Sequence, residues 1–223
     1  MRLFLTTSNL YKSAALAALV TPMSIGRIVQ GNLPLDWCIP SVFLLLMFIA
    51  GAVIAWGQCA GMPGIVTSRP TFLRGLLIVC ILLLPILPIQ VFWLDPAMKS
   101  ALLTAGRPDL LALAYPGTLA GQVSLLFWSA GFQTLFMVAA PMALVARIAG
   151  RWPVALVACL FLRAYIGHLQ IADYGLAGHA LLFTAATVPA IAIACCLFAR
   201  FGLVPAMLFN AGLDLHSFLT GHV

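Results

Sequence analysis

Long stretches without a charged side chain dominate the sequence. Asp, Glu, Lys and Arg are absent from residues 37–68, 75–94, 110–146 and 174–199. A helix needs about 20 apolar residues to cross roughly 30 Å of hydrocarbon. The strict apolar–polar alternation typical of barrel strands is absent. Since lipid offers no hydrogen bonds to the backbone, helices are the spanning structure that remains.

This pattern predicts seven helical segments. They cover residues 12–30, 37–57, 72–94, 118–143, 153–172, 177–199 and 203–219. The expected fold is therefore all-α, a polytopic transmembrane helix bundle of about seven helices in a single membrane domain, 1–223. Within it we expect N-terminal helices and an outer loop over 1–117 and a helical core over 118–223.

The first segment has two interpretations. Pro22, Arg27 and Gln30 interrupt the apolar run of residues 12–30. It therefore either spans the bilayer or lies tilted at the membrane surface as an interfacial helix.

Composition supports a membrane protein and excludes a water-soluble domain. Hydrophobic residues make up 64% of the 223 and charged residues only 7%, against roughly 25% charged in soluble domains. The mean hydropathy is +1.13. The eleven basic residues are scattered singly, so the net charge of +6 does not indicate a nucleic-acid partner. We expect membrane lipid and other integral membrane proteins as partners.

The charges alternate between successive connections. Basic residues flank the first segment and the connections at 58–71, 144–152 and 200–202; they are Arg2, Lys12, Arg69, Arg74, Arg147, Arg151 and Arg200. The other connections carry Asp36, Asp95, Asp109 and Asp173, balanced by Arg27, Lys99 and Arg107. The positive-inside rule then predicts a bacterial inner-membrane protein with a cytoplasmic N-terminus and a periplasmic C-terminus. The one long connection, 95–117, is expected to form a short helix on the outer face.

Ionisable and polar residues at membrane depth are candidate functional groups. We expect an intramembrane polar cluster of Arg147, Arg163, His168, Asn210, Asp214 and His216. Arg163 and Asp214 lie about equally deep in their segments at ~1.5 Å per residue. They are therefore expected to form a buried ion pair, or alternatively to line a pocket.

His168 and His216 are also expected at similar depth. Two facing histidines would ligate a haem iron, a zinc ion or the magnesium of a chlorin. The alternative is that each histidine donates a hydrogen bond to a neighbouring helix. No third ligand lies nearby in the sequence, so no metal site and no definite cofactor are predicted.

Residues 139–219 resemble the CPBP family of intramembrane proteins, which are CAAX-prenyl-protease-2-like and bacteriocin-processing (Abi) proteins. The resemblance rests on AAPMALVARIAG (139–150), AYIGH (164–168) and LFARFGLVPAMLFNAGLDL (197–215). Ala140, Pro141, Arg147 and His168 match the family pattern. It implies a helical core in which paired glutamates and histidines activate water, with metal involved.

The catalytic positions of that pattern are changed in this chain. Met142 and Ala143 stand where the family has two glutamates, and the chain contains no Glu at all. Asn210 and Asp214 stand at the family's His and Asn places. Neither Met nor Ala can act as a general base.

Four functions remain open. The chain is expected to be a non-catalytic scaffold, assembly factor or accessory subunit of a larger membrane complex, a pseudoenzyme of the CPBP protease type. The alternatives are a divergent metal-dependent intramembrane hydrolase using His168, Asp214 and His216, a transporter, and a pigment- or haem-binding subunit.

Overall fold

The computed structural model describes residues 6–30, 34–65 and 67–220, and within them it is helical with no strand. The all-α prediction is confirmed. The helices are α1 (Thr7–Gln30), α2 (Leu35–Cys59), α3 (Arg69–Ile89), η1 (Gln90–Leu94), α4 (Asp95–Thr104), α5 (Pro108–Ala114), α6 (Leu119–Trp128), η2 (Ser129–Ala139), α7 (Ala140–Ala149), α8 (Trp152–Asp173), η3 (Ala177–His179), α9 (Ala180–Phe201), α10 (Leu203–Asp214) and α11 (His216–Thr220). Here η1 and η2 are π-helical and η3 is a 3₁₀ turn.

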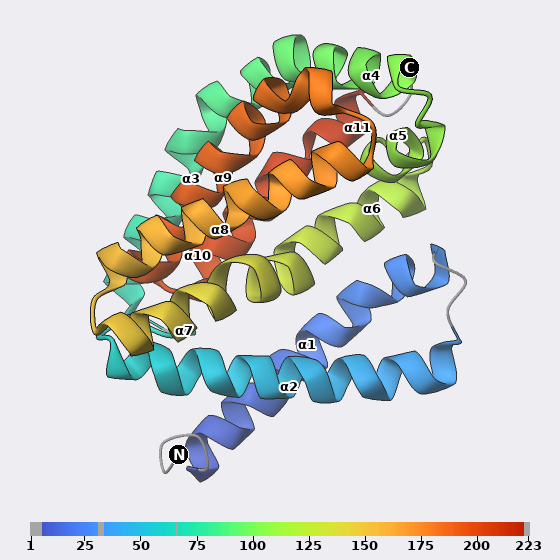
Figure 1. Ribbon diagram of the computed structural model, residues 1–223. Coiled ribbons are helices and arrows are strands. Elements are labelled where there is room, and N and C mark those ends of the chain that lie inside the picture. Colours follow the sequence, from blue (N-terminus) through green and yellow to red (C-terminus); the bar gives the residue numbers. More distant parts are fainter. Residues whose placement is uncertain (1–5, 31–33, 66, 221–223) are drawn as a thin grey trace.

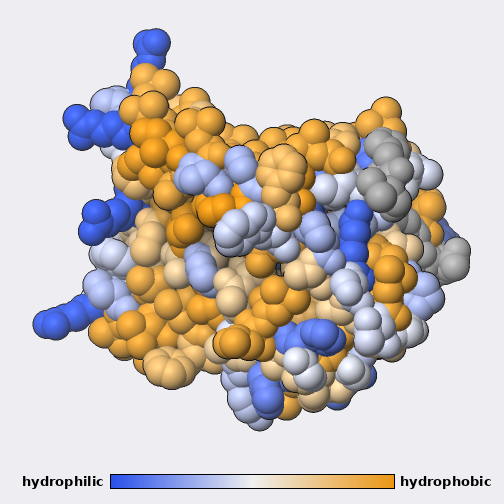
Figure 2. Space-filling view, turned by 90° about the horizontal axis from the view of Figure 1, so that it is seen from above, coloured by the Kyte–Doolittle hydropathy of each residue, from blue (hydrophilic) through white to orange (hydrophobic). Residues whose placement is uncertain are grey.

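The helices run between two ends of a bundle (Figure 1). α8, α9 and α10 lie side by side, and α2 packs against both α1 and α7. The turns after α2, α7 and α9 meet at one end, which lies on the left of Figure 1. Hydrophilic side chains project from this left end in the space-filling view (Figure 2), while much of the remaining visible surface is apolar.

Five helices are long and apolar enough to cross a membrane. Among the described residues they are Leu35–Cys59, Arg69–Thr104, Leu119–Ala149, Trp152–Asp173 and Ala177–Phe201. The chain is therefore a membrane protein, but five spans qualify by length and composition rather than the expected seven. The first and last segments are helical too, as α1 and as α10 with α11.

These two segments fail to qualify for different reasons: α1 carries more polar residues, whereas α10 and α11, with 12 and 5 residues, are too short to span. α1 presents Asn9, Ser13, Thr21 and Ser24 to the interior, where all four are buried. α10 contacts α3, α6, α9 and η2, so protein surrounds much of it. A helix covered by neighbours can satisfy polar side chains that lipid would leave unpaired.

The expected outer loop at 95–117 is only partly correct. α3 continues through η1 into α4 as one helical run, Arg69–Thr104, and Figure 1 shows this run bending over the top of the bundle. Pro85 and Pro88 lie inside α3 just before the π-helical turn. Proline removes backbone hydrogen bonds and bends helices. Residues 95–104 therefore belong to the bundle, and the short helix of this region is α5.

The tight turn between α9 and α10 fixes where α10 begins. Gly202 has a φ of +93°, a conformation that favours glycine. A Cβ there would lie 2.9 Å from the carbonyl oxygen of Gly64. The Leu203 amide donates to that same oxygen at 3.1 Å, so the turn is anchored on the connection after α2.

Candidate functional site

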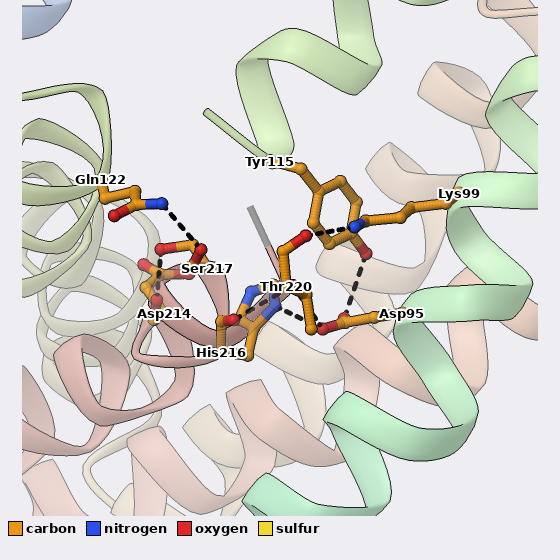
Figure 3. A network of polar contacts seen from close by, with 8 residues as sticks. All are labelled: Asp95, Lys99, Tyr115, Gln122, Asp214, His216, Ser217 and Thr220. Atoms are coloured by element: carbon orange, nitrogen blue, oxygen red, sulfur yellow. Dashed lines mark hydrogen bonds and ion pairs between the residues drawn. The ribbon is translucent and has the colours of Figure 1, made fainter. Parts of the chain in front are cut away.

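A network of polar side chains surrounds Asp95, which is 1% exposed (Figure 3). The Nδ1 atom of His216 lies 2.7 Å from Asp95 Oδ2. The hydroxyls of Tyr115 and Thr220 donate to Asp95 Oδ1 at 3.1 Å and to Oδ2 at 3.2 Å. One carboxylate thus joins three separate parts of the chain: the start of α4, the connection after α5, and α11.

Lys99 brings a positive charge to the same network. Its ammonium group donates to the backbone carbonyl of Thr220 and lies 4.9 Å from the ring centroid of Tyr115. The Tyr115 ring in turn meets the His216 ring edge-on, with centroids 5.5 Å apart. Burial and the Asp95 carboxylate raise the pKa of Tyr115, so its phenol stays protonated and remains a donor.

A second group of contacts ties α6 to the end of the chain. Gln122, which is 1% exposed, donates from Nε2 to the carbonyls of Pro116 at 3.2 Å and Ser217 at 3.0 Å. The Ser217 hydroxyl donates to the Asp214 carbonyl at 2.8 Å. These bonds satisfy backbone groups where α10 breaks into α11.

A third group joins α10 to the π-helical segment η2. The Asn210 amide donates to the Thr134 hydroxyl at 2.8 Å, and that hydroxyl donates to the Ser129 carbonyl at 2.7 Å. The Ser129 hydroxyl donates to the Asn210 carbonyl at 3.3 Å. A π-helix pairs residues five apart, and the Thr134 hydroxyl reaches the Ser129 carbonyl with the same spacing.

A cavity of about 270 Å³ lies beside these networks. Its lining includes Asp95, Tyr115, Ser129, Gln133, Arg163, Asn210, Asp214 and His216. A neighbouring cavity of about 350 Å³ shares Gln133, Arg163 and Thr187 with it. Four of the six residues of the expected polar cluster therefore surround one cavity.

The other two expected cluster residues lie elsewhere. Arg147 is exposed near the end of α7, and His168 is exposed on α8. His168 lines neither cavity, whereas His216 is buried on Asp95. The facing pair of histidines that would ligate a haem or chlorin is therefore not formed. Among the described residues no group of three His, Cys, Asp or Glu side chains converges on a point.

The expected ion pair between Arg163 and Asp214 is also not formed. Both line the smaller cavity, but the ion pairs in the described part of the chain are Arg107–Asp109 and His216–Asp95. The two side chains therefore line one cavity without coming within ion-pair distance of each other. The pocket-lining alternative is the one that holds.

The residues at the family's glutamate positions are part of the hydrophobic core. Met142 and Ala143 have no exposed surface, and both belong to the main core cluster. His168 lies on the exposed side of α8. The matching motif residues therefore do not gather in one site.

Three central residues escaped the sequence prediction. Asp95 was interpreted as a topology signal, Tyr115 lay in the expected loop 95–117, and Gln122 lay in the expected segment 118–143. One feature of the sequence did point to Asp95, which directly follows an uncharged run of 20 residues.

Comparisons with protein-family models, with curated proteins and with solved structures found no match for this chain. The CPBP resemblance therefore stays a prediction.

Proposed function

We propose that this protein is a non-catalytic accessory subunit or assembly factor of a larger membrane protein complex. It would reside in a bacterial inner membrane, with its N-terminus in the cytoplasm and its C-terminus in the periplasm. Its partners would be membrane lipid and other integral membrane proteins. The CPBP resemblance, with its glutamates lost, makes it a pseudoprotease in this proposal.

The proposal rests on the hydrogen bonds that the Asp95 carboxylate accepts. Both of its oxygens accept hydrogen bonds inside the protein, from residues of two other segments, the connection after α5 and α11. A group committed in this way fastens helices together and is not available to activate water.

Burial at the family's catalytic positions gives further support. Met142 and Ala143 have no exposed surface, so no substrate reaches them without repacking the core. The placement of basic turns at one end of the bundle supports the proposed orientation, since Arg69, Arg151 and Arg200 lie at helix ends there.

Native purification tests this proposal. The tagged protein, expressed at its natural level, is extracted in mild detergent and analysed by native mass spectrometry. We expect a complex of fixed stoichiometry with another integral membrane protein. Elution as a free monomer, both in mild detergent and after crosslinking in intact membranes, would contradict the subunit role.

A divergent hydrolase is the second candidate, favoured by one contact. A histidine whose Nδ1 is held by a buried carboxylate resembles the base of hydrolytic enzymes, and His216 also lines the cavity that contains Asp214. A His216→Gln variant separates the two functions. If the protein is a hydrolase, the variant should lose all hydrolytic activity even when it is folded. If the protein is a subunit, the amount of assembled complex should follow the amount of folded variant.

A further inference from the structure

Arg163 places a permanent positive charge near the middle of a membrane span. α8 runs Trp152–Asp173, so Arg163 lies about 16 Å from either end at ~1.5 Å per residue. The guanidinium group does not lose its proton in proteins. A charge at this depth is costly unless a partner neutralises it.

The described residues do not supply that partner. The Nε and Nη1 atoms of Arg163 are buried and have no hydrogen-bond partner among the described residues. The Oδ2 atom of Asp214 is likewise buried and unpartnered, and no ion pair joins it to Arg163. Arg163 as a whole is half-buried, but two of its three guanidinium nitrogens are buried without a partner, which indicates that an anion from outside the described chain belongs beside it.

Three cavities meet at Arg163. Two of them, of about 270 and 350 Å³, carry polar groups such as Gln133 and Thr187. The third, of about 360 Å³, is lined by Arg163 and by apolar residues of α2, η2, α7 and α8; they include Ile49, Trp56, Phe136, Leu144 and Ile166. Each volume is close to or within the range of about 300–1,000 Å³ typical of small-molecule sites.

The chemistry of the lining on the two sides of Arg163 differs. The cavity of about 350 Å³ offers the side chains of Gln133, Gln170 and Thr187 beside the guanidinium, and its lining contains no carboxylate, which suits an anionic head group. The cavity of about 270 Å³ towards α10 instead carries the carboxyl groups of Asp95 and Asp214. Towards α2 and α7 the walls are alkyl and aromatic, which suit a hydrocarbon chain. A small hydrophilic anion would meet mostly apolar walls at this depth, so an amphiphile fits better than free phosphate.

We propose that Arg163 binds the carboxylate or phosphate head of a single-chain amphiphile whose alkyl tail occupies the apolar cavity between α2, α7 and α8. This goes beyond the proposed subunit role and does not depend on it.

Brominated fatty acid quenching tests the site directly, because Trp56 lines the tail cavity. The full chain in lipid nanodiscs is titrated with 9,10-dibromostearate and, separately, with the matching brominated alcohol. Exposed tryptophans such as Trp37 and Trp93 are quenched by probe dissolved in the lipid, so we expect a separate, saturable component of quenching by the carboxylate that is lost in Trp56→Phe. We expect Arg163→Gln to weaken carboxylate binding at least tenfold and to leave the alcohol unaffected. Arg147→Gln, at an exposed arginine of α7, is the matched control and should bind as the wild type.

Two results would overturn the proposal. One is equal affinity of the wild-type protein for the carboxylate and the alcohol, a comparison that needs no variant and therefore stands even where Arg163→Gln does not fold. The other is displacement of dibromostearate by inorganic phosphate as effectively as by dodecyl phosphate, because the site would then bind a free anion and not an amphiphile.

Discussion

Replacing Asp95 with Asn tests whether the buried polar network holds the bundle together. The amide keeps the shape of the carboxylate but loses its charge and one acceptor. Asp95 accepts from His216, Tyr115 and Thr220, and hydrogen bonds to a charged group contribute about 1.5–3 kcal/mol each. Such contacts are not additive, and removing one partner of a buried pair costs about 3–5 kcal/mol. We expect a loss of that size.

Thermal unfolding in detergent, followed by tryptophan fluorescence, measures this loss. At about 2–4 °C per kcal/mol for a chain of this length, Tm should fall by roughly 6–20 °C. Asp173→Asn is the matched control, because Asp173 is an exposed acid at the end of α8, and it should melt close to the wild type. In the double variant with His216→Ala, the loss should be smaller than the sum of the two single losses. A Tm for Asp95→Asn equal to that of the control would refute the fastening role.

Three further outcomes follow from the packing and the surface charges. Gly75→Ala should lower Tm, because the new methyl would lie 2.8 Å from both Phe201 and Pro205, whereas Gly167→Ala, with nothing within 4 Å, should not. Gln122→Ala should cost about 1–3 kcal/mol in chemical unfolding, because two buried carbonyls lose their donor. The Arg107 hydrogen bond lowers the pKa of Asp109 to about 2. A lowered pKa means that the contact is fully present at pH values above the ordinary carboxyl pKa and is lost as pH falls towards 2. NMR of the Asp109 carboxyl carbon should show this transition. A transition near pH 4 would contradict the pairing.

The helices were predictable from the sequence because hydropathy reports directly on which residues can face lipid. All seven expected segments lie in helices. The count of spans was not predictable to the same degree. α10 breaks at Leu215 and is covered by its neighbours, and hydropathy alone cannot tell a short covered helix from a lipid-facing one.

The site was harder to predict because the sequence indicates how deep a residue lies in the membrane but not which neighbouring helix its side chain faces. Arg163 and Asp214 were placed at equal depth, but depth does not fix how each helix is rotated, and the two side chains line one cavity without forming an ion pair. Asp95 was missed for a related reason. A charge after an apolar run looks like the end of a span, but here the helix continues through η1 and carries the carboxylate into the interior.

Membrane proteomics of a deletion strain tests the central claim, a non-catalytic role in a larger complex, most directly. The strain is complemented with the wild-type gene or with Asp214→Asn, which replaces the acid that lines the cavity beside His216. We predict that the abundance of a defined set of membrane proteins falls on deletion and is restored equally by both genes. Restoration by the wild type alone, with the Asp214→Asn protein folded and present at the same level, would contradict a non-catalytic role.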